Sequence, residues 1–224
     1  MPPLDILYED NHLLAVVKPA GLATMGLADD QATLLSVARQ YIKVRYHKPG
    51  NVYLGIVSRL DAPVTGVVLL ARTSKAARRL TEQFRSREVE KTYWAVVEGL
   101  ANPLGTLVNW LVHDERHRRM HVAAPETPGA KEARLSYRRL QTLAGRSLLE
   151  VQLDTGRKHQ IRLQMAHHGH PIVGDRKYGS REAFPAGIAL HARRLAFTHP
   201  VRNDRLELIA PLPASWNRFG ISVR

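Results

Sequence analysis

The segment from Ser58 to Ala71 constrains the fold of this chain more than any other. A short polar element, Ser58-Arg59-Leu60-Asp61, and a turn containing Pro and Gly lead directly into the continuous apolar run Val67–Ala71. A short apolar run bounded by turn residues predicts a buried strand. Asp61 is the only acidic residue between positions 31 and 81, and a carboxylate beside an apolar core is costly unless a charged group pairs with it. Asp61 is therefore a candidate chemical group, and the alternative is a turn aspartate that caps the strand.

The composition predicts a globular, strongly basic protein. The 224 residues are 44% hydrophobic, which is enough for one large domain or two small lobes. The excess of Lys and Arg gives a net charge of +13, which indicates a polyanionic partner such as nucleic acid. The alternative is a generally basic composition without such a partner.

Cysteine is absent, which excludes disulfides, thiolate metal sites and a thiol nucleophile. We find no signal peptide and no apolar stretch near the ~20 residues that a membrane helix needs. We therefore expect a cytoplasmic protein that does not enter a membrane.

The pattern of apolar residues predicts an α+β fold rich in strands, because few helices interrupt them and they do not alternate regularly. The expected elements are a hairpin over 6–17, helices over 33–46 and from Ser74, strands over 67–71, 91–98, 135–143 and 148–153, a helix from about Lys158, and a hairpin over 190–209.

Residues 101–131 are rich in Pro, Gly, His and Arg, and we expect them to form an irregular basic insertion within a single domain over 1–224. Such a segment suits contact with RNA, and a loose surface loop is the alternative. A second basic group lies on the helix from Ser74, where Lys75, Arg78, Arg79 and Arg85 form either a solvated face or an RNA contact.

A second polar element runs from Asp154 to Arg162. A strand ends in Asp-Thr-Gly, and the following helix opens with Arg157, Lys158 and His159. Helix N-termini attract phosphate, and the two cations add to that attraction. Arg162 lies one turn inside this helix and can supply the bidentate partner that Asp61 needs, although a local surface pair is the alternative.

A metal site is disfavoured. The cluster of His159, His167, His168 and His170 contains no carboxylate, and its His-Gly-His-Pro end is typical of a helix terminus and turn. The same absence disfavours a metal-dependent nuclease. The spacing from Gly169 to Gly174 imitates a phosphate-binding loop, but Asp175-Arg176 follows where Lys and Ser or Thr belong.

Taken together, these elements resemble the RluA-type RNA pseudouridine synthases over nearly the whole chain. The resemblance rests on the ordered blocks "LAVVKPAG" at 14–21, "RLDAPVTGVVLLAR" at 59–72, "KTYWAVVEG" at 91–99, "LDTGRKHQIRLQMAHHGHPIVGDRKYG" at 153–179 and "ALHARRLAFTHP" at 189–200. It implies a mixed, largely antiparallel sheet bent into two lobes with a central basic cleft. The small N-terminal RNA-binding domain of many relatives is not expected, because the similarity begins almost at residue 6.

The resemblance also implies a role for each matching residue. Asp61 matches the catalytic aspartate, Tyr93 the active-site tyrosine that stacks on the target base, and Arg162 the basic residue that pairs with the aspartate. Arg59 matches the arginine that fills the space left by the flipped base, and Leu190 matches an apolar wall of the uracil pocket.

One departure stands out, because Ser58 replaces the histidine that usually precedes Arg-Leu-Asp in this family. It puts the local RNA contacts in doubt and leaves the catalytic set whole.

The implied reaction moves the ribose bond of uracil from N1 to C5. It is an isomerisation, so we expect no metal, redox cofactor or nucleotide cofactor. We expect RNA, tRNA or rRNA, as the substrate, and a monomer. Sequence does not decide between nucleophilic attack by Asp61 and a glycal intermediate. The alternative function is a non-catalytic RNA-binding or ribosome assembly factor on the same fold.

Overall fold

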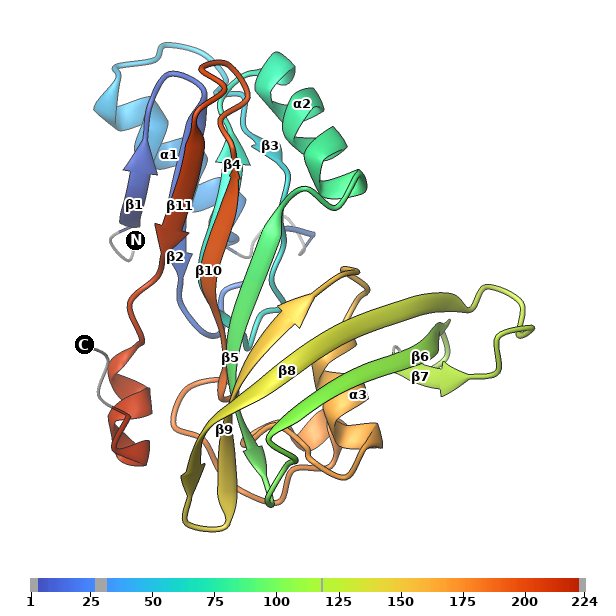
Figure 1. Cartoon of the computed structure of the whole chain (residues 1–224). Helices are drawn as coiled ribbons and strands as arrows, with labels where there is room; N and C mark the ends of the chain where they lie inside the picture. Colours follow the sequence, from blue (N-terminus) through green and yellow to red (C-terminus); the bar gives the residue numbers. More distant parts are fainter. Residues whose placement is uncertain (1–3, 27–31, 118, 222–224) are drawn as a thin grey trace. The chain divides into compact units, whose positions relative to one another are not determined.

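The structure is a computed structural model that describes residues 4–26, 32–117 and 119–221 (Figure 1). The chain divides into two compact units, each described by itself. Unit 1 contains Met1–Glu90 and Ala192–Pro213, and unit 2 contains Lys91–His191 and Ala214–Arg224. The prediction of an α+β fold with a largely antiparallel sheet is confirmed.

Unit 1 is built on strands in the order β1-β2-β4-β10, with β3 beside β4 and β11 beside β10. Every residue of β4 is buried, so the prediction from the apolar run is confirmed. β2 pairs with β4 along its whole length, from Leu13 opposite Ala71 to Lys18 opposite Gly66. The strands are β1 (Asp5–Glu9), β2 (Leu13–Lys18), β3 (Gly55–Ile56), β4 (Thr65–Ala71), β10 (Leu190–Thr198, mostly in this unit) and β11 (Arg205–Ile209).

Two amphipathic helices belong to unit 1, α1 (Leu34–Arg45) and α2 (Ser74–Arg85). Thr33 caps α1 in a capping box with Ser36. Thr73, one residue before the predicted start of the helix at Ser74, caps α2. Apolar side chains of α1 pack in one core with the buried faces of β2 and β4, where the residues are Leu14, Val16, Leu34, Ala38, Ile42, Leu54, Val68 and Leu70.

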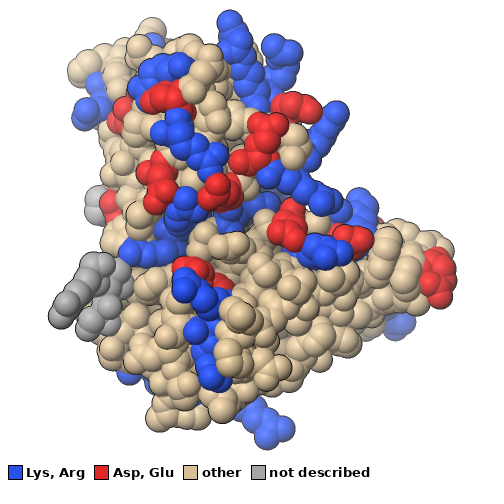
Figure 2. Space-filling view, in the orientation of Figure 1, with Lys and Arg blue, Asp and Glu red and all other residues tan. Residues whose placement is uncertain are grey.

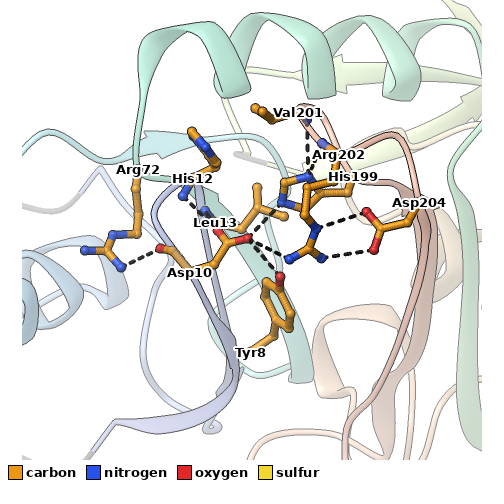
Figure 3. A network of polar contacts seen from close by, with 9 residues as sticks. All are labelled: Tyr8, Asp10, His12, Leu13, Arg72, His199, Val201, Arg202 and Asp204. Carbon is orange, nitrogen blue, oxygen red and sulfur yellow. Dashed lines mark hydrogen bonds and ion pairs between the residues drawn. The ribbon is translucent and has the colours of Figure 1, made fainter.

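A buried polar network ties the β1–β2 turn to the β10–β11 turn (Figure 3). Asp10 accepts hydrogen bonds from the Tyr8 hydroxyl at 2.8 Å and from Nε2 of the fully buried His199 at 2.9 Å. His199 Nδ1 in turn accepts the backbone N–H groups of Val201 and Arg202. Burial opposes the ionisation of Asp10. Hydrogen bonds from the backbone N–H groups of His12 and Leu13 and from the side chains of Tyr8 and His199 nevertheless keep its pKa below the usual value.

Unit 2 contains strands in the order β5-β9-β8-β6-β7. They are β5 (Glu90–Glu98), β6 (Leu104–Asp114), β7 (Arg119–Ala123), β8 (Lys131–Leu143) and β9 (Arg146–Leu153). The expectation of irregular structure over 101–131 is corrected here, because β6 pairs in antiparallel register with β7 on one side and with β8 on the other. The Pro and Gly residues that suggested irregularity lie at strand ends or in the loop between β7 and β8.

Helix α3 (Gln160–His167) is almost entirely buried in unit 2. Two glutamine amides attach it to the sheet. Gln160 Nε2 donates to the Arg134 carbonyl, and Gln164 Nε2 approaches the carbonyls of Leu107 and Ala133. The short helices η1 (Arg176–Tyr178) and η2 (Ala214–Phe219) complete the unit. None of the helices in the described part of the chain is long and apolar enough to cross a membrane.

Candidate functional site

The segment that carries Asp61 is held by a buried lysine. Lys18, at the end of β2, has no exposed surface. Its ammonium group donates to the carbonyl oxygens of Pro19 at 2.8 Å, Leu22 at 2.7 Å and Ala62 at 3.0 Å. An ammonium group has three N–H donors, so these carbonyls satisfy it completely. One of the three belongs to the residue after Asp61, and the lysine therefore joins the 19–22 loop to the aspartate segment.

Two hydroxyl groups hold the residues before Asp61. Thr24 is buried, and its Oγ1 donates to the Leu60 carbonyl at 2.9 Å and lies 3.1 Å from the Leu60 nitrogen, whose N–H it accepts. Ser58 Oγ accepts the N–H of Leu69 in β4 at 2.9 Å. Ser58, the departure from the family pattern, therefore ties the start of this segment to the central strand. Hydrogen bonds between the backbone and the side chains of Lys18, Thr24 and Ser58 therefore restrict the Asp61 segment on both sides.

Within unit 1, Lys18 and Asp61 interact electrostatically. Burial lowers the pKa of Lys18 to about 8, and the negative charge of Asp61 opposes that shift. The Asp61 side chain is partly buried, whereas Arg59 is exposed.

We expect Lys18→Met to lower the free energy of unfolding at pH 7 by about 2–4 kcal/mol, because buried carbonyls lose their donor. In the parent, Lys18 loses its proton at a lower pH in the folded state than in the unfolded state, so the unfolded state binds more protons between pH 8 and 10.5. The free energy of unfolding therefore rises with pH through that window. Urea unfolding at several pH values should show that this contribution is absent from the variant. Lys43→Met, at an exposed position of α1, should change neither quantity. Parental stability and pH dependence in Lys18→Met would contradict this account.

In unit 2, strand register places Tyr93 on the face that α3 covers. Tyr93 lies opposite Val151, Val151 opposite Tyr137, and Tyr137 opposite Gly105. Directly opposed residues share a face, and so do residues an even number of positions apart on one strand. Leu111 of β6 is therefore on the Tyr93 face, and it packs against Leu163 of α3.

Arg162 lies in α3 and is buried. Its Nε donates to Asp175 Oδ2 at 2.6 Å and its Nη2 to Asp175 Oδ1 at 2.9 Å. The sequence reasoning did not identify Asp175, because it weighed only Asp61 and a local pair at the surface as partners of Arg162. Asp61 and Arg162 belong to different units, and their pairing stays a prediction.

The three residues before α3 reach different parts of unit 2. Arg157 Nε donates to the Glu132 carbonyl in β8, and Lys158 Nζ lies 3.3 Å from His113 Nε2 in β6. His159 Nδ1 lies 2.7 Å from the Tyr178 hydroxyl. The backbone of His159 is left-handed, with φ of 54°, which is uncommon outside glycine and marks a constrained entry to the helix.

Leu190 opens β10 and is buried, as an apolar wall requires. The adjoining residue Ala189 exchanges backbone hydrogen bonds with Val96 and Val173, which fixes Leu190 close to β5 and to the loop after α3. Its contact with a base is not tested and stays a prediction.

No three His, Asp or Glu side chains gather as metal ligands anywhere in the described ranges. Charged side chains are spread unevenly over the surface. On the visible face of unit 1, Lys and Arg mix with Asp and Glu, whereas few charges lie over the sheet of unit 2 (Figure 2).

Sequence reasoning missed Lys18, Thr24, Asp175 and Tyr178. Three of them lie in or beside the quoted blocks, so the blocks themselves held the signal for Lys18, Asp175 and Tyr178. Thr24 carried no signal, because only the fold shows that its hydroxyl contacts Leu60.

A family sequence model, similar bacterial sequences and a similar solved structure all match this chain to RNA pseudouridine synthases. A sequence model of the family described as RNA pseudouridylate synthase matches residues 12–167. The ribosomal large subunit pseudouridine synthase D of Xylella fastidiosa is 40% identical over 94% of this chain and 66% of its own length. That of Yersinia pestis is 36% identical over 94% of this chain and 68% of its own length. The chain thus spans about two thirds of these relatives. The structure of human RNA Pseudouridylate Synthase Domain Containing 4 superposes with a TM-score of 0.81 at 26% identity, covering 98% of this chain and 94% of that one.

Proposed function

Because this chain belongs to the family of RNA pseudouridylate synthases, we propose that it isomerises specific uridines of ribosomal RNA with Asp61 as the catalytic carboxylate. The members of this family are isomerases that act on RNA. The names of the similar bacterial proteins support ribosomal RNA over tRNA as the substrate. The observation that carries the proposal is the Asp61 segment, which Lys18 and Thr24 hold from both sides.

In the proposed mechanism, the target uridine leaves its stack, at a cost of roughly a few kcal/mol, before the ribose–N1 bond breaks. Asp61 acts as an ionised carboxylate, either on the ribose or in promoting a glycal, and the base rotates and rejoins through C5. Preorganisation matters because a held carboxylate needs no rearrangement at the moment of reaction. No cofactor is proposed.

We propose that Arg162 also pairs with Asp61. A guanidinium group has five N–H donors, and the bidentate pair with Asp175 uses two of them, so a second acidic partner is compatible with that pair. Asp175 fixes the plane of the guanidinium group in the interior of unit 2. Such a group stabilises the ionised form of an aspartate that it meets.

The remaining candidate residues would hold the RNA. Arg59 is exposed and is proposed to fill the space left by the flipped uridine. Leu190 would line the uracil pocket. Arg157 and Lys158 are exposed cations at the entry to α3, where they suit phosphate groups, and His159 lies beside them.

Tyr93→Phe tests the proposed proton transfer. We expect the single-turnover rate to fall by on the order of a hundredfold, because positioned acids and bases contribute about that much, while the ring still stacks on the base. RNA affinity should stay within about threefold of the parent. Tyr137→Phe, which removes a hydroxyl from the same row of the sheet, is the matched control and should keep the parental rate. A parental rate in Tyr93→Phe would reduce Tyr93 to a stacking platform.

The phosphate contacts can be counted from salt dependence. Replacing both Arg157 and Lys158 with Ala should weaken RNA binding and reduce the slope of log affinity against log salt by about 1–2. Filter binding between 50 and 200 mM salt measures that slope, with the exposed α1 pair Arg39→Ala and Lys43→Ala as control. A slope equal to that of the parent would remove these two residues from the RNA-binding surface.

A further inference from the structure

Tyr178 occupies the centre of unit 2 and has no role in the function proposed above. It ends η1, and its side chain is buried at 4% exposure in a core with Leu111, Met120 and Leu163. It therefore touches the β6–β7 hairpin and α3 at once. A buried tyrosine that spans two elements needs partners for its hydroxyl group, and the structure supplies one from each side.

The hydroxyl of Tyr178 links β7 to the entry of α3. It accepts the backbone N–H of Met120 at 3.3 Å and lies 2.7 Å from His159 Nδ1. Burial raises the pKa of Tyr178, so the group keeps its proton and can donate it to a neutral His159. His159 is the residue with the left-handed backbone, so this bond joins Tyr178 to the constrained entry of α3.

The ring of Tyr178 faces two guanidinium groups. The Cζ atom of Arg162 lies 5.2 Å from the ring centroid, and that of Arg119, at the start of β7, lies 5.0 Å from it. Both distances are within the range of a cation–π interaction, which strengthens when the groups are removed from water. The same tyrosine thus contacts a cation of the hairpin and the arginine that Asp175 anchors.

We propose that Tyr178 is a positioning residue for Arg162, and that it couples the β6–β7 hairpin to the catalytic centre through Arg119 and Met120. Asp175 sets the plane of the Arg162 guanidinium group, and the Tyr178 ring, which lies 5.2 Å from Arg162 Cζ, limits movement of the group toward that side. RNA that engages the hairpin would then act on Arg162 through Tyr178. This inference rests on the proposed role of Arg162.

The test compares two variants of Tyr178 with a control. Tyr178→Leu removes the ring and the hydroxyl, and Tyr178→Phe removes only the hydroxyl. We expect Tyr178→Leu to lower the single-turnover rate at saturating RNA by on the order of tenfold, the effect of losing a desolvated cation–π contact. Tyr178→Phe should lower it less, and RNA affinity should change by less than about threefold. Rates are compared at a temperature well below each melting midpoint, so that unfolding does not contribute, and Tyr137→Phe serves as the control.

A double-mutant cycle with Arg119→Ala separates positioning from a merely structural role. Arg119→Ala should lower the rate in the parent and have no further effect in the Tyr178→Leu background, or in Tyr178→Met, which also lacks the ring, if the Leu variant does not fold. If the effects of the Arg119 and Tyr178 substitutions on the rate are additive, the proposed coupling is wrong. It is also wrong if both Tyr178 variants keep the parental rate while Arg162→Ala is inactive, and in both cases the proposed role of Arg162 still stands. Parental rates in Arg162→Ala itself would instead show that the proposed role of Arg162 is wrong, and this inference with it.

Discussion

Asp61→Asn should abolish pseudouridine formation, with a loss of at least about a thousandfold, while RNA affinity stays close to that of the parent. The amide has nearly the same shape as the carboxylate but cannot carry the charge or act as a nucleophile. Affinity should persist because phosphate contacts dominate RNA binding and Asp61 makes none. Lys18 and Thr24 hold the backbone on both sides of Asp61, through the carbonyls of Ala62 and Leu60, so the segment should keep its conformation.

A tritium-release or mass-based assay measures the loss, and filter binding measures the affinity. Asp204→Asn is a matched control, because it makes the same exchange at an exposed aspartate that pairs with Arg202 in the β10–β11 turn. Turnover by Asp61→Asn within tenfold of the parent would end the assignment of Asp61 as the catalytic carboxylate.

Arg162→Ala should both inactivate and destabilise the protein. Its removal leaves the Asp175 carboxylate buried without its counter-ion, and breaking such a pair from one side costs about 3–5 kcal/mol. Activity should be lost even at temperatures where the variant is folded, because Asp61 would lack the cation that we propose for it. Urea unfolding and a single-turnover assay measure the two effects separately.

Arg146→Ala provides the control for stability. Arg146 also pairs closely with a carboxylate of unit 2, Glu182, but both side chains are about 30% exposed. We expect a change of about 1 kcal/mol or less, since partly exposed pairs contribute little. An Arg162→Ala variant as stable as Arg146→Ala would contradict the buried-pair account, and an active one would contradict its proposed role in catalysis.

The sequence predicted the local structure well where one physical signal dominated. The run Val67–Ala71 could form only a buried strand, and β4 is buried throughout. The prediction failed at 101–131, because Pro and Gly near the ends of β6 and β7 suggested an irregular segment, whereas the pairing of β6 with both β7 and β8 depends on the fold. Arg118, which we grouped with the basic residues of that segment, lies outside the described residues.

Contacts between distant residues were harder to predict. The need of Asp61 for a charged neighbour was a sound physical argument, yet the buried ammonium group that influences it belongs to Lys18, far away in sequence. Likewise, Arg162 was expected to have a carboxylate partner, and the carboxylate found is Asp175. A charge requirement can be read from one residue, whereas the identity of its partner depends on how the chain folds.

We propose that this chain converts uridine to pseudouridine in ribosomal RNA by means of Asp61. The most direct measurement incubates the purified protein with large-subunit ribosomal RNA transcribed in vitro and maps pseudouridine at single-nucleotide resolution. We predict modification at one or a few uridines with the parent protein and none with Asp61→Asn, which should still bind the same RNA. Pseudouridine formation by both the parent and Asp61→Asn would contradict the role of Asp61. If the transcript is not modified, RNA from assembling large subunits is tested in the same way, and absence of pseudouridine from both RNAs would contradict the proposed activity.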